Sequence, residues 1–178
     1  MIKIKKKVIK IGILGGTFDP PHVGHLHISK VSIKKLNLNK LIWAVTKKNP
    51  LKKKPFLKIK ERIKLSNQIT KNEKKIFIRY YDDKIKSPNT FKLLKYIKKR
   101  SPKIDLFFLI GADNLLNLHK WKSWEKIPEF AKIVVFPRNN YLIKKGNYIA
   151  TKRLKKKDLI YINAKIINIS SSLIRKFW

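Results

Sequence analysis

The sequence predicts an α/β protein, a single Rossmann-like, doubly wound domain with a central parallel sheet. Short apolar runs alternate with segments of helical spacing, which is the order of strands and right-handed crossovers in a parallel sheet. One of these runs, residues 104–111, is almost entirely apolar, as expected for a strand covered on both faces. The 178 residues, 43% of them hydrophobic, are enough for one domain with its own core.

Apolar and alternating patterns place the elements in order along the chain. Strands are expected at 8–14, 41–45, 75–81, 104–111 and 131–137, and one or two short edge strands within 159–169. Helices are expected from 22–24 to about 36, over 58–69, over 89–99 and from 170 onward. Residues 138–158 are polar and predict a connection without regular structure.

The most unusual feature of the composition is its charge. Lys and Arg number 45 against 10 Asp and Glu, which gives a net charge of +35. Such a balance can indicate nucleic-acid binding, but the lysines are spread along the whole chain and no RNP, KH or zinc-finger signature accompanies them. Lys, Ile, Asn and Phe fill the chain, as drift toward AT-rich codons produces. We therefore expect no specific nucleic-acid partner.

The chain contains no cysteine, which excludes disulfides, a thiolate nucleophile and a thiolate metal site and is compatible with a reducing cytoplasm. No apolar run is long enough to span a bilayer. The basic and then apolar start lacks a signal-peptide cleavage site. We expect a cytoplasmic protein without a membrane partner, and nothing in the sequence indicates its oligomeric state.

The stretch GGTFDPPHVGH, residues 15–25, differs from the rest of the chain. It has neither the GxGxxG spacing of a dinucleotide fingerprint nor the pattern of a P-loop. Gly15 and Gly16, expected directly after a strand, allow backbone N–H groups to approach an anion closely. The helix that follows presents the positive end of its dipole to a phosphate.

Two histidines in this stretch support the same interpretation. His22 and His25 are spaced i, i+3, so both imidazoles point the same way in the first helical turn. Gly24 leaves space beside them for a base or ribose. The two imidazoles, the backbone amides and the helix terminus together predict a polyphosphate site. A metal site that adds His27 has no carboxylate at the usual ligand spacing. A general acid–base pair remains compatible with the phosphate site.

The stretch ISSSLIR, residues 169–175, offers a second candidate anion site. Ser170, Ser171 and Ser172 offer hydroxyls and a helix N-cap. Arg175 lies one turn after Ser171 and carries a planar fork suited to phosphate. An ordinary capped C-terminal helix explains the pattern equally well.

The third stretch, IGADNLLNLHKWKSW, follows a predicted strand. Asp113 follows that strand and Gly111. Because acids are scarce in this chain, an acid at the carboxyl end of a strand is informative, and a ribose hydroxyl or an amine is a natural partner for it. Trp121 and Trp124 can stack on a ligand ring or belong to the core, and we expect Trp124 to be a core residue.

Together these stretches resemble the nucleotidylyltransferase superfamily, whose (H/T)xGH signature stands here as HVGH at 22–25. Within it, GGTFDPPHVGHL, NPLKK, SPNTFKLL, IGADNLLNLHKW and ISSSLIR resemble the bacterial nicotinate-nucleotide adenylyltransferases. The resemblance covers nearly the whole chain and is weak over 138–158. It implies one nucleotidylyltransferase domain over 1–178, whose C-terminal helix completes the phosphate site. The implied activity is adenylyl transfer from ATP to nicotinate mononucleotide, giving deamido-NAD and pyrophosphate, with Mg²⁺ carried by ATP.

The same resemblance implies a role for each matching residue. His22 and His25 are the catalytic residues, and His25 stabilises the α-phosphate in the transition state. The nicotinate nucleotide contacts Thr90 and stacks on Trp121. No metal ligand from the protein is implied. ATP is expected to contact Gly15, Gly16, Thr17, Phe18, Gly24, Lys52, Asp113, Ser170, Ser171 and Arg175.

The chain departs from this family at two places. Lys122 stands where an aromatic residue often follows the stacking tryptophan, and the KSPN loop before Thr90 lacks the usual Tyr-Thr pair. Two alternatives are kept. One is a sibling nucleotidylyltransferase with nicotinamide mononucleotide or phosphopantetheine as the acceptor. The other is a basic nucleic-acid-binding protein without catalysis.

Overall fold

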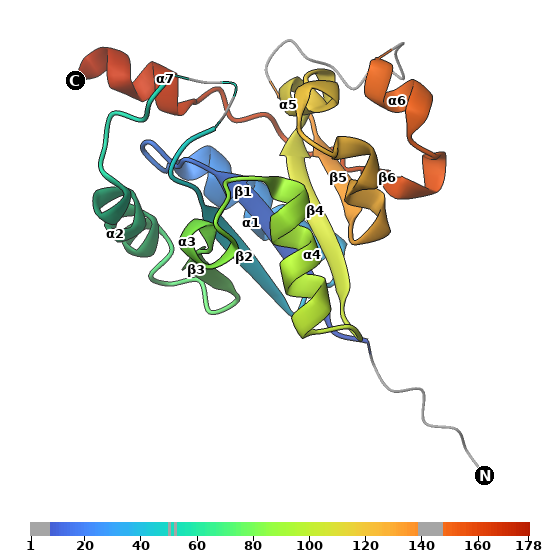
Figure 1. Ribbon diagram of the computed structural model, residues 1–178. Coiled ribbons are helices and arrows are strands. Elements are labelled where there is room, and N and C mark those ends of the chain that lie inside the picture. The colour runs from blue at the N-terminus through green and yellow to red at the C-terminus, as the bar shows by residue number, and fades with distance from the viewer. Residues whose placement is uncertain (1–7, 50, 52, 139–147) are drawn as a thin grey trace.

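A parallel sheet of six strands runs through the part of the protein that the computed structural model describes, residues 8–49, 51, 53–138 and 148–178 (Figure 1). The strand order is β3-β2-β1-β4-β5-β6, and every neighbouring pair is parallel. The predicted fold class is confirmed. The strands are β1 (Lys10–Gly16), β2 (Lys40–Val45), β3 (Ile76–Tyr80), β4 (Asp105–Gly111), β5 (Lys132–Phe136) and β6 (Leu159–Tyr161).

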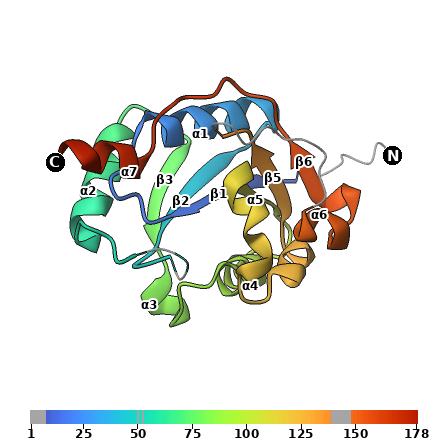
Figure 2. The ribbon, with the colours of Figure 1, turned by 90° about the horizontal axis from the view of Figure 1, so that it is seen from above.

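Helices cover both faces of this sheet. Seen from above, α1 and α4 lie on opposite sides of it (Figure 2). The α-helices are α1 (Val23–Lys35), α2 (Ile59–Ile69), α3 (Asp82–Ile85), α4 (Thr90–Arg100), α5 (Ala112–Leu116), α6 (Ile149–Arg153) and α7 (Ser171–Ile174). Short 3₁₀ helices are η1 (Leu118–Lys120), η2 (Trp124–Glu129), η3 (Lys156–Asp158) and η4 (Arg175–Phe177).

The sheet order has a direct consequence for ligand binding. The chain winds from β1 outward to β3 and then returns to place β4 on the other side of β1. The loops after β1 and β4 therefore leave the sheet toward opposite faces, and open α/β sheets bind ligands in the crevice that this reversal creates. The opening motif and the IGADN stretch both lie at this edge.

Helix α1 packs on the sheet through small polar residues. Ser29 and Ser32 are fully buried, and each hydroxyl donates to the carbonyl four residues earlier in the helix. Ser29 also accepts a hydrogen bond of 2.8 Å from the indole Nε1 of Trp43 on β2. Because serine is small, the helix can approach the sheet closely, and this hydrogen bond joins α1 to β2.

The first strand ends later than the apolar pattern predicts. Gly15 and Gly16 are the last residues of β1 and pair with Ala44 and Val45 of β2, so they are not part of the following loop. The apolar run sets the strand's interior, but cross-strand pairing decides where it ends.

Residues 148–158 also differ from the expectation. They contain α6 and η3, so the prediction of an irregular connection is wrong there, and 139–147 lie outside the described residues. Ala150 of α6 is fully buried in the core on the α4 face, which explains why so short a helix is held. Residues 159–169 supply one strand, β6. No helix in the described ranges is both long and apolar enough to cross a membrane.

Candidate nucleotide-binding site

A cavity of about 370 Å³ opens at the carboxyl ends of β1 and β2. Four predicted site residues border it, namely Gly15 and Gly16 from β1, Thr90 from the start of α4, and Trp121 after η1. The Trp121 ring meets Phe108 of β4 edge to face, with centroids 6.1 Å apart. The fold therefore brings together segments that are far apart in the sequence, and one wall of the cavity is a positioned indole that can stack on a ring.

The charges at this cavity are mixed. Lys48, Lys120 and Lys122 border it, so the departure at Lys122 places a cation where the family often has an aromatic residue. Asp82 also borders the cavity, but its Oδ2 accepts hydrogen bonds from Thr46 Oγ1 at 2.7 Å and from the Lys47 backbone N–H at 2.8 Å. The lysines therefore dominate the charge that a ligand meets.

The predicted histidine pair is present at the start of α1. His22 is the N-cap residue and His25 lies in the first turn, with their ring centroids 3.8 Å apart. The backbone N–H of His22 donates to Nδ1 of His25 at 3.3 Å. A nitrogen that accepts a hydrogen bond carries no proton, so a neutral His25 ring has its proton on Nε2. The prediction that the two imidazoles lie together is confirmed.

His22 is buried without a polar partner of its own. Its side chain is 6% exposed, and among the described residues neither Nδ1 nor Nε2 has a hydrogen-bond partner. Burial, reinforced by the positive charge of Arg138, lowers its pKa from 6.5 to about 4. The ring is therefore neutral at pH 7 and can both donate and accept one hydrogen bond.

Gly24 is required by the packing of the His22 ring. A Cβ at this position would lie 2.9 Å from His22 Nδ1 and 3.1 Å from Ile169 Cγ2. The space predicted for a base or ribose is thus bordered closely by the imidazole. The predicted contact between Gly24 and a nucleotide stays a prediction.

Two aromatic rings pack near the His25 ring. Phe18 is 1% exposed and stacks on Trp43, with centroids 4.8 Å apart and an angle of 8° between the planes. Its ring also lies 4.9 Å from that of His25. Phe18 adopts a φ of 49°, in a region that non-glycine residues seldom occupy. The backbone turns sharply at Phe18, and the buried ring orients the histidine.

Asp113 and Arg138 form an ion pair beside His22. Asp113 Oδ2 lies 3.3 Å from Arg138 Nη1, and both side chains are partly exposed. Arg138 and His22 border a small hollow of about 60 Å³. Arg138 was not predicted as a site residue, although it follows β5 after a single proline and the strand-end rule that selected Asp113 applies to it equally.

The C-terminal segment, residues 170–175, forms hydrogen bonds with the opening loop. Ser170 caps α7 by accepting from the Leu173 backbone N–H at 3.1 Å, which confirms the predicted N-cap. Ser171 Oγ donates to the Pro20 carbonyl at 2.8 Å. Arg175 donates to the Asp19 carbonyl and lies 3.4 Å from its Oδ2. Contacts from these side chains to phosphate stay predictions.

Asp19 was not predicted as a structural residue of the site. It is 4% exposed, and its carboxylate accepts from the backbone N–H groups of Phe56 at 2.8 Å and Leu57 at 2.9 Å. Its position within the opening motif was the available signal. Together with Arg175, Asp19 holds the opening loop against two segments that are distant in sequence.

Two predictions are not decided by the described residues. Lys52 lies outside them. The second concerns a metal site: within residues 8–49, 51, 53–138 and 148–178, no group of three or more His, Cys, Asp or Glu side chains could hold an ion.

Thr17 lies in the opening loop, and its carbonyl oxygen accepts a hydrogen bond from Arg62 Nη1 at 2.6 Å.

A parallel sheet with two adjacent histidines at its switch point and a cavity beside them defines a nucleotide-binding α/β protein. The family described as cytidylyltransferase-like matches residues 13–177. A probable nicotinate-nucleotide adenylyltransferase of Pelagibacter ubique (strain HTCC1062) is 42% identical over 97% of this chain and 96% of its own. One of Clostridium tetani (strain Massachusetts / E88) is 35% identical over 94% and 86%.

A solved structure is similar in fold. It is the Plasmodium falciparum nicotinic acid mononucleotide adenylyltransferase complexed with NaAD, with a TM-score of 0.76 and 24% identity, covering 95% of this chain and 83% of that one. The chain therefore belongs to the cytidylyltransferase-like family and, within it, to the nicotinate-nucleotide adenylyltransferases.

The buried His22 predicts a specific dependence of stability on pH. Because its pKa is about 4 in the folded state and 6.5 as the ordinary value, the unfolded chain takes up a proton in this interval while the folded chain does not. The free energy of unfolding should therefore fall as the pH decreases from 6.5 to 4, by up to about 3 kcal/mol. Urea unfolding of the wild type and of His22→Asn across this range isolates the effect, since all other groups titrate in both proteins. Parallel stability curves for the two proteins would show that His22 is not desolvated.

Proposed function

We propose that this protein transfers the adenylyl group of ATP to nicotinate mononucleotide, giving deamido-NAD and pyrophosphate in NAD biosynthesis. The observation that supports this most directly is the buried, neutral His22 beside His25. This pair follows β1, and the end of β1 borders the cavity that Thr90 and Trp121 also line. The names of the relatives that match nearly the full chain point to the same activity.

The site divides into two halves in this proposal. The acceptor occupies the larger cavity, with its pyridine ring on Trp121 and Thr90 beside it. ATP lies along the opening loop and the C-terminal segment, with its phosphates at His22 and His25. Gly15 and Gly16 border the acceptor cavity and also belong to the ATP side, since both substrates meet at the end of β1 in this proposal. The ATP side is completed by Thr17, Phe18, Gly24, Lys52, Asp113, Ser170, Ser171 and Arg175.

The reaction is a direct displacement at the α-phosphorus of ATP. An oxygen of the acceptor phosphate forms the new P–O bond, and the bond to the β-phosphate breaks as pyrophosphate leaves. The acceptor phosphate is already an anion at neutral pH, so no strong general base is needed. What the protein must supply is position and stabilisation of the developing charge. The His25 Nε2–H, fixed as a donor by the bond at Nδ1, is suited to the α-phosphate oxygens.

Magnesium enters this proposal with ATP. Mg²⁺ prefers oxygen ligands in a near-octahedral arrangement and is commonly held by substrate phosphates. Among the described residues, the Asp19 carboxylate binds backbone N–H groups, while Asp113 pairs with Arg138 through Oδ2 and leaves Oδ1 without a hydrogen-bond partner. The metal would neutralise charge on the leaving pyrophosphate.

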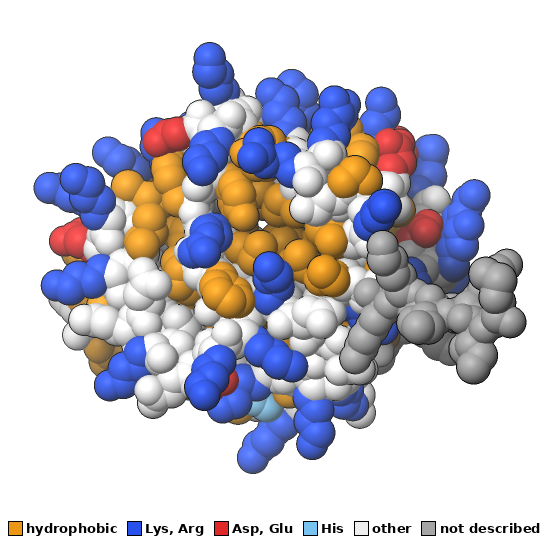
Figure 3. Space-filling view, turned by 90° about the horizontal axis from the view of Figure 1, so that it is seen from below, with side chains coloured by type: hydrophobic (Ala, Val, Ile, Leu, Met, Phe, Trp, Pro, Cys, Tyr) orange, Lys and Arg blue, Asp and Glu red, His pale blue; other side chains and the backbone are white. Residues whose placement is uncertain are grey.

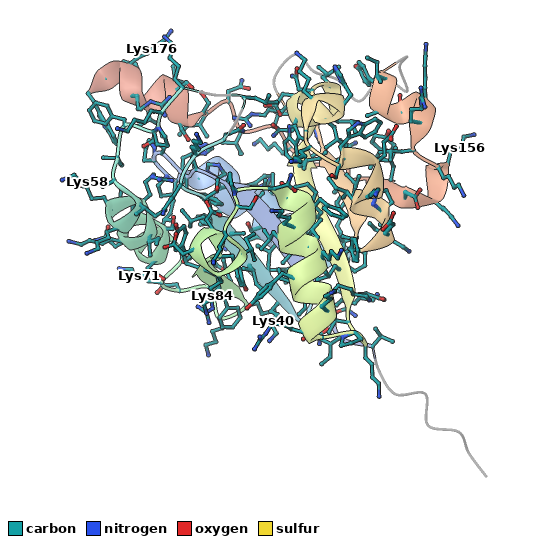
Figure 4. All side chains as sticks on the ribbon, in the orientation of Figure 1. Lys40, Lys58, Lys71, Lys84, Lys156 and Lys176 are labelled. Atoms are coloured by element: carbon teal, nitrogen blue, oxygen red, sulfur yellow. The ribbon has the colours of Figure 1, made fainter. Side chains whose placement is uncertain are left out.

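The distribution of cations argues against a nucleic-acid-binding function. Labelled lysines from β2, α3, η3 and η4, and from the residues that flank α2, point outward on different sides of the molecule (Figure 4). Seen from below, Lys and Arg surround a hollow with apolar side chains and do not form one continuous patch (Figure 3). Nucleic-acid-binding proteins usually gather their cations on one face or element, so we propose that ATP and the mononucleotide are the partners.

The test of this function is the choice of acceptor. Nicotinate mononucleotide and nicotinamide mononucleotide differ in one substituent, a carboxylate or a carboxamide. Because Lys48, Lys120 and Lys122 border the cavity, the anionic substituent should be favoured. We expect kcat/KM to be higher for the acid by at least about tenfold, which corresponds to about 1.4 kcal/mol.

Pyrophosphate release from ATP, measured with these two acceptors and with phosphopantetheine, decides the assignment. Equal kcat/KM for the two mononucleotides would indicate dual specificity. A higher value for the amide or for phosphopantetheine would mean that the acceptor is assigned wrongly, and binding of random duplex DNA without ATP turnover would support the non-catalytic alternative.

His25 provides the test of the mechanism. If its Nε2–H stabilises charge on the α-phosphate, His25→Ala should lower kcat by about 10²–10⁴, while a non-hydrolysable ATP analogue still binds. His119→Ala is the matched control, because His119 borders neither hollow and its loss should leave kcat unchanged. Unchanged turnover in the His25 variant would remove this residue from the mechanism.

A further inference from the structure

Arg62 is a buried arginine at the centre of the loops that border the site. Its side chain is only 2% exposed, although it lies in the first turns of α2. Its Nη1 donates to the carbonyls of Thr17 at 2.6 Å and Thr46 at 2.7 Å. Its Nη2 donates to the Lys47 carbonyl at 3.1 Å, and Nε donates to the Leu57 carbonyl at 3.0 Å. All four acceptors are backbone oxygens, so Arg62 fixes the path of the main chain.

These carbonyls belong to both halves of the site. Thr17 directly precedes Phe18, whose ring lies against His25 on the phosphate side. Thr46 borders the larger cavity on the acceptor side. The ladder between β1 and β2 continues to the bond from Thr46 N–H to the Gly16 carbonyl. Beyond this last bond of the ladder, Arg62 still connects the loops that follow β1 and β2, because it donates to the carbonyls of both Thr17 and Thr46.

Each half also has anchors that do not involve Arg62. On the phosphate side, Asp19 accepts from two backbone N–H groups and Ser171 donates to Pro20. On the acceptor side, Asp82 accepts from the Thr46 hydroxyl and the Lys47 N–H. Loss of Arg62 should therefore leave each half formed and change their relative position.

The guanidinium group is suited to this task and an ammonium group is not. Arginine presents its N–H donors in a rigid planar fork, whereas lysine has a point charge on a flexible stem. Burial lowers the pKa of Arg62, and the charges of Asp19 and Asp82 oppose that change. Since no carboxylate bonds to it directly among the contacts described, the four carbonyls solvate its charge.

We propose that Arg62 is a positioning residue that sets the distance between the α-phosphorus of ATP and the attacking oxygen of the acceptor phosphate. This inference rests on the proposed adenylyl transfer. Arg62 acts through the backbone at Thr17 and Thr46 and contacts neither substrate. In a direct displacement the reacting atoms must be held close, and a misplacement of about 1 Å can cost about 10²-fold in rate.

The test separates position from binding. In Arg62→Lys, kcat for pyrophosphate release should fall by about tenfold or more. The Kd of a non-hydrolysable ATP analogue and the Kd of nicotinate mononucleotide, each measured alone by calorimetry, should change by less than about threefold. Arg62→Met keeps the side-chain volume without the charge and serves as the second variant, with the same expected split.

Thr70→Val is the matched control for a loss of stability in the same helix. Thr70 lies just past the far end of α2, is buried, and donates to the Ser66 carbonyl at 2.8 Å. At a temperature where all variants are folded, its kcat should equal that of the wild type.

Three results would overturn the inference: a wild-type kcat in the folded Arg62 variants, a loss of both ligand affinities as large as the loss of kcat, or an equal loss in Thr70→Val. A wild-type protein that releases no pyrophosphate contradicts the proposed function instead. An active wild type with equally active Arg62 variants contradicts only the role of Arg62.

Discussion

The imidazole of His22 is buried, and among the described residues no group forms a hydrogen bond with either of its ring nitrogens. Burying a polar group without a partner costs free energy, so the surroundings must enforce this arrangement. Gly24 leaves the ring its space, and helix α1 begins directly after it. The result is a neutral hydrogen-bonding group at a helix N-terminus, next to Arg138, which is where an anionic ligand gains most.

The rest of the edge depends on keeping this group in place. The strand order puts the opening loop beside the switch point, but strand order alone does not fix a loop to within hydrogen-bond distance. Buried polar side chains do that. Asp19 binds backbone N–H groups of the segment before α2 and contacts Arg175 from the C-terminal segment, while Arg62 binds backbone carbonyls of the loops after β1 and β2. These bonds therefore hold the main chain of the loops at the site.

The pattern of side chains along the sequence predicted those features that depend on local geometry. The i, i+3 spacing of His22 and His25 predicted that the rings meet, and the alternation of apolar runs predicted the sheet. The partners of Asp19 and Arg62 could not be predicted, because backbone N–H and carbonyl groups are present at every residue and carry no signal in the sequence. The end of β1 was missed for a related reason, since Gly15 and Gly16 extend the strand only through pairing with β2. Arg138 was within reach of the strand-end argument that found Asp113.

We propose that His22 is kept neutral and unpaired in order to receive a nucleotide phosphate. The most direct measurement is the NMR titration of the His22 imidazole, with and without a non-hydrolysable ATP analogue. The free protein should show a pKa of about 4, and bound phosphate should raise that pKa because nearby negative charge favours the imidazolium. An ordinary pKa in the free protein, or identical titration curves with and without the nucleotide, would contradict the claim.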